Sequence, residues 1–573
     1  MGYYEIYCQL CGVSFNISRF RTRNEPRSAA WADSSASTRD EFSWVPYNSY
    51  YDCPRDGDRS CCLVHRGLLP WQLKQGQSAA QGLYEDDPEG ATARDRASAE
   101  MTARSMETLW REYDSPESQW TFSVHGPPPP TFDTEFLPLS TIDYLEDNEE
   151  DEVEEKDWQA VREQQRIRRE KRAEYEHVAG PDCQHTNCYN GHNISVEQMT
   201  DCLTAQCLYV KPDDWEPRPD DMPFEATSRY CLSGLAGNFT PARHGFAEGK
   251  TDNDDNVWIE TEEDQRESGV AFHPACFEIF TVVSDAVLGK VDADGLVRLR
   301  NLSCKREVET FCDWADDVFS CRSQVWEHSP GTEYLVANPL FVPGFREICE
   351  HAMNQGEGFD VRQSPFEARQ RKPNATASSD PFHRLPAELV HKVVGYLGSR
   401  DIAAMRASSR AFEHLPISLW HRLLVDDMPF LYEAWRDDAT PYDWACQDVQ
   451  LLQKIRLEEE EWRTRRFIKA RDLEDVDMDA HAAYLAATPE VPPWHGGPES
   501  KKMLDEAYAR RKAAGPIALP HDKTNWYQLY RDIVTNWDDF LGLKNRERIW
   551  GTIHDICERI RDIPESDQTM TDS

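Results

Sequence analysis

The segment from Phe382 to Trp420 constrains the fold of this chain most, because apolar residues recur there at helical spacing between residues that stop helices. Pro386 suits the first turn of a helix, where its missing N–H costs nothing, and Gly398 can end that helix. Four apolar residues between them fall on one helical face: Leu389, Val393, Tyr396 and Leu397. The pattern therefore predicts a short amphipathic helix at the start of this segment.

Two more short helices are predicted after the first. Asp401 can cap a second helix that carries Ile402, and Ser418 can cap a third that carries Leu419 and Leu423. A piece near the lower limit of about 40 residues for independent folding exposes more apolar side chain than it can bury. We therefore expect this segment to need a partner surface; the alternative is an ordinary helical hairpin inside a larger helical domain.

The order and spacing of short motifs in this segment strongly resemble the F-box. The matching motifs are Leu385-Pro-Ala-Glu-Leu389, Asp401-Ile402, Ser409-Arg-Ala-Phe412 and Ser418-Leu-Trp420, within residues 381–424. The resemblance implies a three-helix motif that docks on the Skp adaptor and, through it, on the cullin of a Skp-cullin-F-box ubiquitin ligase. The rest of the chain is then expected to recruit a protein substrate.

Transferred residue by residue, the resemblance implies nine adaptor-facing anchors that become buried in a helix-packing interface. They are Leu385, Pro386, Leu389, Val393, Val394, Leu397, Ile402, Leu419 and Trp420. Such an adaptor contributes proximity and orientation and leaves the chemistry to recruited enzymes.

The chain has seventeen cysteines, an odd number, which favours free thiols or metal ligands over disulfides in a reducing compartment. The tightest pair is Cys8-Gln-Leu-Cys11-Gly, in which a tight turn points two sulfurs at one tetrahedral ion and glycine lets the backbone fold beneath them. The best distant complement is His273-Pro-Ala-Cys276, directly before an apolar run. We therefore predict one structural zinc held by Cys8, Cys11, His273 and Cys276.

Other ligand sets stay open at this point. Cys53, Cys61, Cys62 and His65 lie closer in sequence to the first pair but are less tightly spaced. A second, looser site could be formed by Cys183, Cys188, Cys202 and Cys207 with His185 and His192. Buried thiols without metal are the main competing interpretation, because free cysteine commonly behaves as a small apolar core residue.

The layout of most of residues 1–425 is similar to that of a fungal F-box protein family. The shared features are the amino-terminal Cys-x-x-Cys-Gly, Tyr189-Asn-Gly-His192-Asn-Ile-Ser195, Leu232-Ser-Gly-Leu235, His273-x-x-Cys276-Phe and the late F-box. This similarity favours the distant pairing of the first two cysteines with His273 and Cys276, and it implies no defined substrate.

The chain divides further by composition. We predict a Cys-containing region with loops over 1–142, a charged helical spacer over 143–178 whose helix runs from about Glu149 to His177, and a Cys- and Trp-rich folded region over 179–365 that packs with the amino terminus. A linker at 366–380 precedes the F-box at 381–425 and a helical carboxy-terminal region at 426–573. The predicted fold class is α+β, mostly helical.

The carboxy-terminal region carries two apolar stripes at helical spacing, separated by a turn predicted at Gly542. They consist of Trp526, Leu529, Tyr530, Ile533, Val534, Trp537, Phe540 and Leu541, and then Ile549, Trp550, Ile553, Ile556, Cys557 and Ile560. We expect both stripes to be core, with Trp537 among the core residues.

Composition narrows the classes of function. With 63 Lys and Arg against 103 Asp and Glu, the formal charge of −40 disfavours nucleic acids and anionic membranes as partners and favours proteins. The sequence shows no signal peptide and no window long and apolar enough to cross a bilayer, which predicts a cytoplasmic and/or nuclear protein.

The sequence contains no specific P-loop, serine-hydrolase, zinc-protease or dinucleotide-binding motif. We therefore predict a non-catalytic adaptor subunit. The alternatives are an F-box scaffold that acts outside a cullin complex and a zinc-dependent enzyme built from residues 1–365, which would require an open coordination position on the metal.

Overall fold

The computed structural model describes residues 7–26, 29–31, 53, 59–65, 136–138, 175–211, 215–218, 221–235, 247–250, 256–259, 269–304, 311–322, 326–353, 381–412, 415–449, 451, 478–487 and 498–563. Within these residues the chain is α+β and mostly helical, as predicted. It forms two compact units: unit 1 comprises Met1–Asn16, Glu197–Trp326 and Gly331–Ser573, and unit 2 comprises Ile17–Val196 and Glu327–Pro330. The predicted regions 1–142 and 179–365 are thus each divided between the two units.

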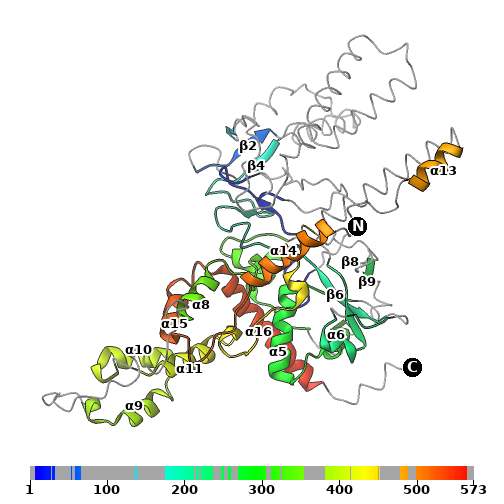
Figure 1. Ribbon diagram of the computed structural model, residues 1–573. Coiled ribbons are helices and arrows are strands. Elements are labelled where there is room, and N and C mark those ends of the chain that lie inside the picture. The colour runs from blue at the N-terminus through cyan, green and yellow to red at the C-terminus, as the bar shows by residue number, and fades with distance from the viewer. Residues whose placement is uncertain are drawn as a thin grey trace. The chain divides into compact units, whose positions relative to one another are not determined.

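The core of unit 1 is a pair of helices, α5 (Pro274–Leu288) and α16 (Leu541–Asp562), that pack against each other (Figure 1). α5 has Pro274 in its first turn and ends at Gly289, whose φ of 73° is the left-handed conformation that favours glycine. Residues 274–284 of α5 are all buried. α6 (Ala293–Cys304) and the 3-10 turn η5 (Glu333–Val336) also pack on α16.

A three-stranded antiparallel sheet leads directly into α5. Its central strand β6 (Gln206–Val210) pairs with β10 (Val270–Phe272) on one side and with β7 (Tyr230–Leu232) on the other. Every residue of β10 is buried, and the strand ends one residue before His273, which precedes α5. The sheet therefore fixes where α5 begins. A separate hairpin consists of β8 (Ala247–Lys250) and β9 (Asn256–Ile259).

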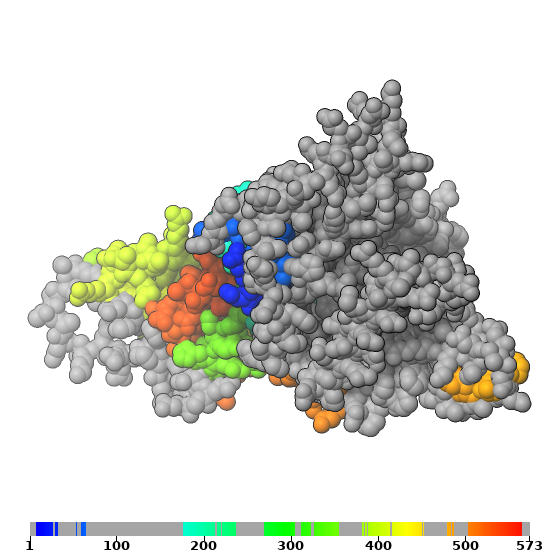
Figure 2. All heavy atoms as spheres, turned by 90° about the horizontal axis from the view of Figure 1, so that it is seen from above, coloured from blue at the N-terminus to red at the C-terminus, as the bar shows by residue number. Residues whose placement is uncertain are grey.

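The three short helices predicted between residues 381 and 425 are present. They are α9 (Ala387–Val394), α10 (Ser399–Ser408) and α11 (Ile417–Asp427), with the 3-10 turns η7 (Pro381–Arg384) and η8 (Arg410–Phe412). α11 packs on α15 (Trp526–Thr535), which in turn packs on α8 (Phe345–Met353). Figure 2 shows the yellow-green atoms of this segment at the surface beside the orange-red atoms of α15.

Unit 1 has further described elements. They are η4 (Pro223–Ala226), α7 (Asp316–Cys321), η9 (Tyr432–Ala434), η10 (Asp443–Cys446), α13 (Met478–Ala487) and α14 (Pro498–Ala514). None of the helices in the described part of the chain is long and apolar enough to span a membrane.

The predicted turn at Gly542 is wrong, because Gly542 lies in the first turn of α16. A Cβ atom at this position would stand 2.4 Å from the carbonyl oxygen of Asn338, so glycine allows the helix to approach that backbone closely. Four members of the predicted stripes also lie outside the core: Val534 is 51% exposed, and Tyr530, Trp537 and Leu541 are only partly buried.

Replacing Trp526 is expected to destabilise unit 1 far more than replacing Trp537. Trp526 is fully buried and its indole N–H donates to the carbonyl of His521 at 2.9 Å, so Trp526→Ala should cost about 3–5 kcal/mol of unfolding free energy. Trp537→Ala should cost well under half of that. Chemical denaturation of both variants measures the difference, and equal losses would contradict the burial seen here.

Unit 2 contains small sheets and buried ion pairs. β2 (Cys62–His65) pairs antiparallel with β3 (Phe136–Pro138) and with β4 (Tyr175–Val178), while β1 (Arg19–Phe20) pairs parallel with β5 (Tyr189–Asn190). Arg21 binds both carboxylate oxygens of Glu176, at 2.7 and 3.1 Å, and both side chains are nearly inaccessible. This bidentate pair joins the amino-terminal segment of the unit to β4.

The predicted end of the charged helical spacer at His177 is wrong. Residues 175–178 form strand β4, in which His177 lies opposite Leu63 of β2. The basic run that suggested a helix ends at Arg172, and pairing with β2 decides the conformation of the residues after it. The rest of the predicted helix, residues 149–174, lies outside the described residues.

Candidate metal centre and docking face

The amino-terminal pair Cys8 and Cys11 lies on a tight turn of unit 1. Tyr7 and Ser14 form an antiparallel bridge, and the amide of Gly12 donates to the carbonyl of Cys8 at 2.8 Å. Gly12 has a φ of 77°, and a Cβ there would stand 2.9 Å from the ring of Trp314. Both the backbone conformation and the close packing therefore require glycine after the second cysteine.

The other two candidate ligands lie at the start of α5. His273 is the residue before the helix, and Cys276 follows in its first turn, where its amide donates to the carbonyl of His273 at 2.9 Å. The amide of His273 also approaches the sulfur of Cys8 at 3.4 Å. The turn is held against the sheet by the amide of Gln9, which donates to Ala271 of β10 at 2.8 Å.

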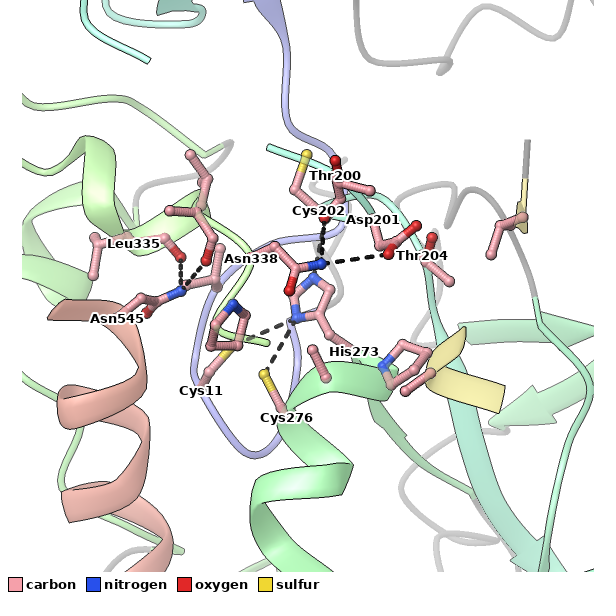
Figure 3. Close-up of a pocket in the computed structure, with 18 of the residues that line it drawn as sticks. Cys11, Thr200, Asp201, Cys202, Thr204, His273, Cys276, Leu335, Asn338 and Asn545 are labelled. Atoms are coloured by element: carbon pink, nitrogen blue, oxygen red, sulfur yellow. Dashed lines mark hydrogen bonds between the residues drawn. The ribbon is translucent and has the colours of Figure 1, made fainter. Parts of the chain in front are cut away.

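The structure brings together all four residues predicted as metal ligands. The ligand atoms of Cys8, Cys11, His273 and Cys276 lie within 4.8 Å of one another, and all four residues are buried. The Nδ1 atom of His273 lies 3.5 Å from the sulfur of Cys11 and 3.9 Å from that of Cys276 (Figure 3). We call this group the knuckle site. Three cysteines and one histidine around a common centre can hold a metal ion.

The imidazole of His273 is oriented for coordination through Nδ1. Its Nε2 atom lies 3.0 Å from the carbonyl oxygen of Cys202, to which it can donate, and its ring packs 4.5 Å from that of Phe15. A hydrogen bond from the remote ring nitrogen to a carbonyl is the usual support of a metal-bound histidine, because it fixes the tautomer and the ring plane.

The thiols and the imidazole of the knuckle site shift one another's pKa values. Burial raises the pKa of Cys276 well above its ordinary value. Burial also acts to raise the pKa of Cys11, but hydrogen bonds with Cys276 and Cys8 and the nearby His273 together hold it well below its ordinary value. Burial alone would lower the pKa of His273, but its interactions with Cys8 and Cys11 raise it to about 10. Cys11 therefore supplies a buried thiolate, a donor that binds divalent cations.

Helix α16 supports the knuckle site from the carboxy-terminal end of the chain. Arg548 donates to the carbonyl oxygen of Cys11 at 2.7 Å. One turn earlier, Asn545 donates to the carbonyls of Leu335 and Ala337 at 3.1 and 2.7 Å (Figure 3). Sequence spacing could not find this support, because it depends on the tertiary packing of α16 beside α5.

A small cavity adjoins the knuckle site. Its volume is about 30 Å³, and Cys11, His273, Cys276, Asn338 and Asn545 are among the residues that line it. A water molecule needs roughly 10–15 Å³ measured in this way, so the cavity has room for one or two waters. The cavity therefore leaves room for solvent beside the ligands.

The rival ligands predicted from sequence are not part of the knuckle site. Cys53, Cys61, Cys62 and Cys188 belong to unit 2. Cys62 packs with Val64 and Val178, and Cys188 packs with Phe20. His185 and His192 also lie in unit 2, Cys207 lies in β6, and Cys202 contributes only its carbonyl oxygen to His273. The predicted site of Cys183, Cys188, Cys202 and Cys207 with His185 and His192 is wrong, because among the described residues Cys183 groups instead with Cys53, Cys61 and His177.

Helix α9 presents a row of exposed apolar side chains. Leu389 and Val393 lie on α9 and Tyr396 follows two residues after its end; their exposed fractions are 48%, 40% and 81%. Phe382, just before the helix, is 37% exposed. In the described part of the chain, nine large apolar residues are exposed, and these four are among them. We call the row of Leu389, Val393 and Tyr396 the α9 face.

The predicted adaptor-facing anchors divide into two groups. Pro386, Leu389 and Val393 are exposed, and Leu385 and Leu397 are partly buried. Val394, Ile402, Leu419 and Trp420 are at most 7% exposed, so these four are buried within the chain itself. The reason is packing within the unit: the ring of Trp420, for example, lies 4.9 Å from that of Tyr527 on α15.

Arg422 of α11 joins the end of α9 to the rest of the unit. Its guanidinium donates to the carbonyl oxygens of Val394 and Leu397, at 3.2 and 2.9 Å. These are carbonyls that the end of a helix leaves without internal partners. The α9 face is therefore held in a defined position while its apolar side chains stay exposed.

Comparison with known proteins adds one short match. No family model and no solved structure matches the chain. A segment of 45 residues is 47% identical to the protein named "ATP-dependent RNA helicase mss116, mitochondrial" of Aspergillus oryzae. That match covers 8% of this chain and 7% of the helicase, so the chain spans only a small part of this relative.

Proposed function

We propose that this chain is an F-box adaptor of a Skp-cullin-F-box ubiquitin ligase. Helices α9, α10 and α11 are proposed to dock on the Skp adaptor, and the remainder of the two units to bind a protein substrate. The observation that carries the proposal is the α9 face: Leu389 and Val393 on α9 and Tyr396 just after it are exposed, while Val390 and Val394 of the same helix are buried. An exposed apolar row of this kind marks a protein interaction site.

The chemistry of the α9 face suits a protein partner. The face lies in the segment whose sequence motifs resemble the F-box, and Leu389 and Val393 are both predicted anchors. With a formal charge of −40, the chain as a whole repels nucleic acid and anionic lipid. A helical partner groove that accepts side chains at positions i, i+4 and i+7 would cover Leu389, Val393 and Tyr396 together.

We further propose that zinc occupies the knuckle site. Three thiolates and one imidazole form a common ligand set of structural zinc, and the four ligand atoms are near enough to share one ion. Zinc bound there would join the amino-terminal turn to the start of α5 and so stabilise the core of unit 1. Cys8, Cys11, His273 and Cys276 would hold the ion, and the hydrogen bond to Cys202 would orient the imidazole.

A zinc-dependent enzyme is less well supported. A catalytic zinc keeps an open position for water or substrate, whereas the knuckle site offers four protein ligands and a cavity of about 30 Å³. The helicase match gives no support for ATP-dependent activity, because it covers 8% of the chain and the sequence has no P-loop motif.

The test of the adaptor proposal is direct binding to the Skp adaptor. The double variant Leu389→Glu/Val393→Glu places two charges on the α9 face, and we expect binding about 30-fold weaker or worse, the effect of losing one interface hot spot of 2 kcal/mol. Met503→Glu on α14 is the matched control, since Met503 is 53% exposed in the same unit. Calorimetric titration of the full-length proteins measures the affinities, and circular dichroism verifies that the variants stay folded.

Unchanged affinity of the double variant would contradict the proposed docking face.

A second experiment distinguishes the adaptor from an F-box scaffold that acts outside a cullin complex. The complex with the Skp adaptor is mixed with purified cullin, and the adaptor proposal expects a stable ternary complex on gel filtration. A complex that binds the Skp adaptor but excludes the cullin would favour the scaffold.

A further inference from the structure

Unit 2 contains a second group of three cysteines and one histidine. The ligand atoms of Cys53, Cys61, His177 and Cys183 lie within 4.8 Å of one another. The sulfur of Cys53 lies 3.7 Å from that of Cys183 and 4.0 Å from Nε2 of His177, and the sulfur of Cys183 lies 3.9 Å from the same nitrogen. We call this group the strand site.

Strand pairing brings these residues together. Cys61 directly precedes β2, and His177 lies in β4 opposite Leu63. Because side chains alternate along a strand, Cys61, Leu63 and their cross-strand neighbour His177 share one face of the sheet. Cys62 takes the opposite face, where it packs with Val64 and Val178.

The turn after β4 is built around the sulfur of Cys61. The amide of Gly180 approaches that sulfur at 3.5 Å, and the amide of Cys183 donates to the carbonyl of Gly180 at 3.1 Å. A Cβ on Gly180 would stand 2.3 Å from the carbonyl oxygen of Arg59, so only glycine permits this approach. An amide directed at a cysteine sulfur beside a tight turn is consistent with a metal-bound thiolate, which accepts hydrogen bonds well.

The strand site is shielded from water. Cys53, Cys61 and His177 are 4%, 0% and 2% exposed, and Cys183 is partly buried. The ring of His177 packs against Phe20, with the ring centroids 4.1 Å apart.

We propose that Cys53, Cys61, His177 and Cys183 bind a second structural zinc ion. The ligand set matches the donors that tetrahedral zinc prefers. Binding replaces the thiol protons, which are released to solvent, and ties the segment before β2 to β4 and to the turn that follows it. The strand site and the knuckle site share no residue, so each unit has its own ion.

Zinc analysis of the purified full-length protein tests this proposal. Mass spectrometry of the metal content is expected to give two zinc ions per chain for the natural sequence, one for Cys53→Ser and two for Cys62→Ser. Cys62 is the matched control, because it is as buried as its neighbour but faces away from the site. His177→Cys should restore a four-thiolate site and keep two ions, whereas His177→Ala should lose one.

Two zinc ions retained in both Cys53→Ser and Cys183→Ser would overturn the proposal. So would a natural protein that holds one ion and loses it in Cys276→Ser. X-ray absorption of the natural protein remains decisive if a variant fails to fold. It should show an average of three sulfurs at about 2.3 Å and one nitrogen at about 2.0–2.1 Å for each of two ions. A disulfide between Cys53 and Cys183 in protein purified under reducing conditions would also contradict the proposed zinc site.

Discussion

Loss of metal from the knuckle site is expected to unfold the core of unit 1. Without an ion, three thiol groups and the imidazole of His273 remain buried around one point, with no metal to join them. Structural zinc contributes roughly 10–16 kcal/mol of apparent binding energy in small zinc domains at neutral pH. Whole domains are stable by only about 5–15 kcal/mol, so removing the ion can exceed the total stability of the unit.

Cys276→Ser and chelation of the natural protein should therefore have the same effect. Hydrogen exchange of α5 (Pro274–Leu288) measures it, because this helix begins within the site and lies in the core. We expect protection of α5 to be lost in Cys276→Ser and kept in Cys557→Ser, a cysteine that is 0% exposed on α16 and lies outside both clusters. Equal protection of α5 in the two variants would show that the knuckle site does not stabilise the fold through a metal.

The knuckle site could be predicted from sequence because its ligands come as two short motifs. Cys-x-x-Cys-Gly specifies a turn, and His-x-x-Cys before an apolar run specifies the first turn of a helix, so each half carries its own local signal. The strand site has no such signal. Cys53, Cys61, His177 and Cys183 are isolated from one another, and only the pairing of β2 with β4 brings them together.

Helical periodicity predicted the three helices between residues 381 and 425 but could not tell outward from inward apolar residues. Leu389 and Val394 look alike in sequence, yet one is 48% exposed and the other 1%. The difference arises from tertiary contacts, such as those of α11 with α15 about 100 residues later. The same reason explains Trp537. Its helical spacing predicted a core position, but tertiary packing buries it only partly.

Replacing Arg546 is expected to destabilise unit 1 about as strongly as replacing Trp526. Arg546 of α16 and Glu433 of η9 form an ion pair at 2.6 Å, with side chains that are 0% and 1% exposed. Arg546 also donates to the carbonyl of Pro339 at 2.5 Å, and its guanidinium lies 5.3 Å from the ring of Tyr432. Arg546→Met should cost about 3–5 kcal/mol, because it leaves the Glu433 carboxylate buried without its cation.

The double variant Arg546→Met/Glu433→Gln separates this charge effect from a loss of packing. Removing both charges avoids the isolated buried carboxylate, so the double variant should recover a large part of the stability lost by Arg546→Met alone. Urea denaturation of the natural protein, both single variants and the double variant gives the coupling energy. A double variant no more stable than Arg546→Met would show that the arginine acts through its contacts with Pro339 and Tyr432, and that its charge contributes little.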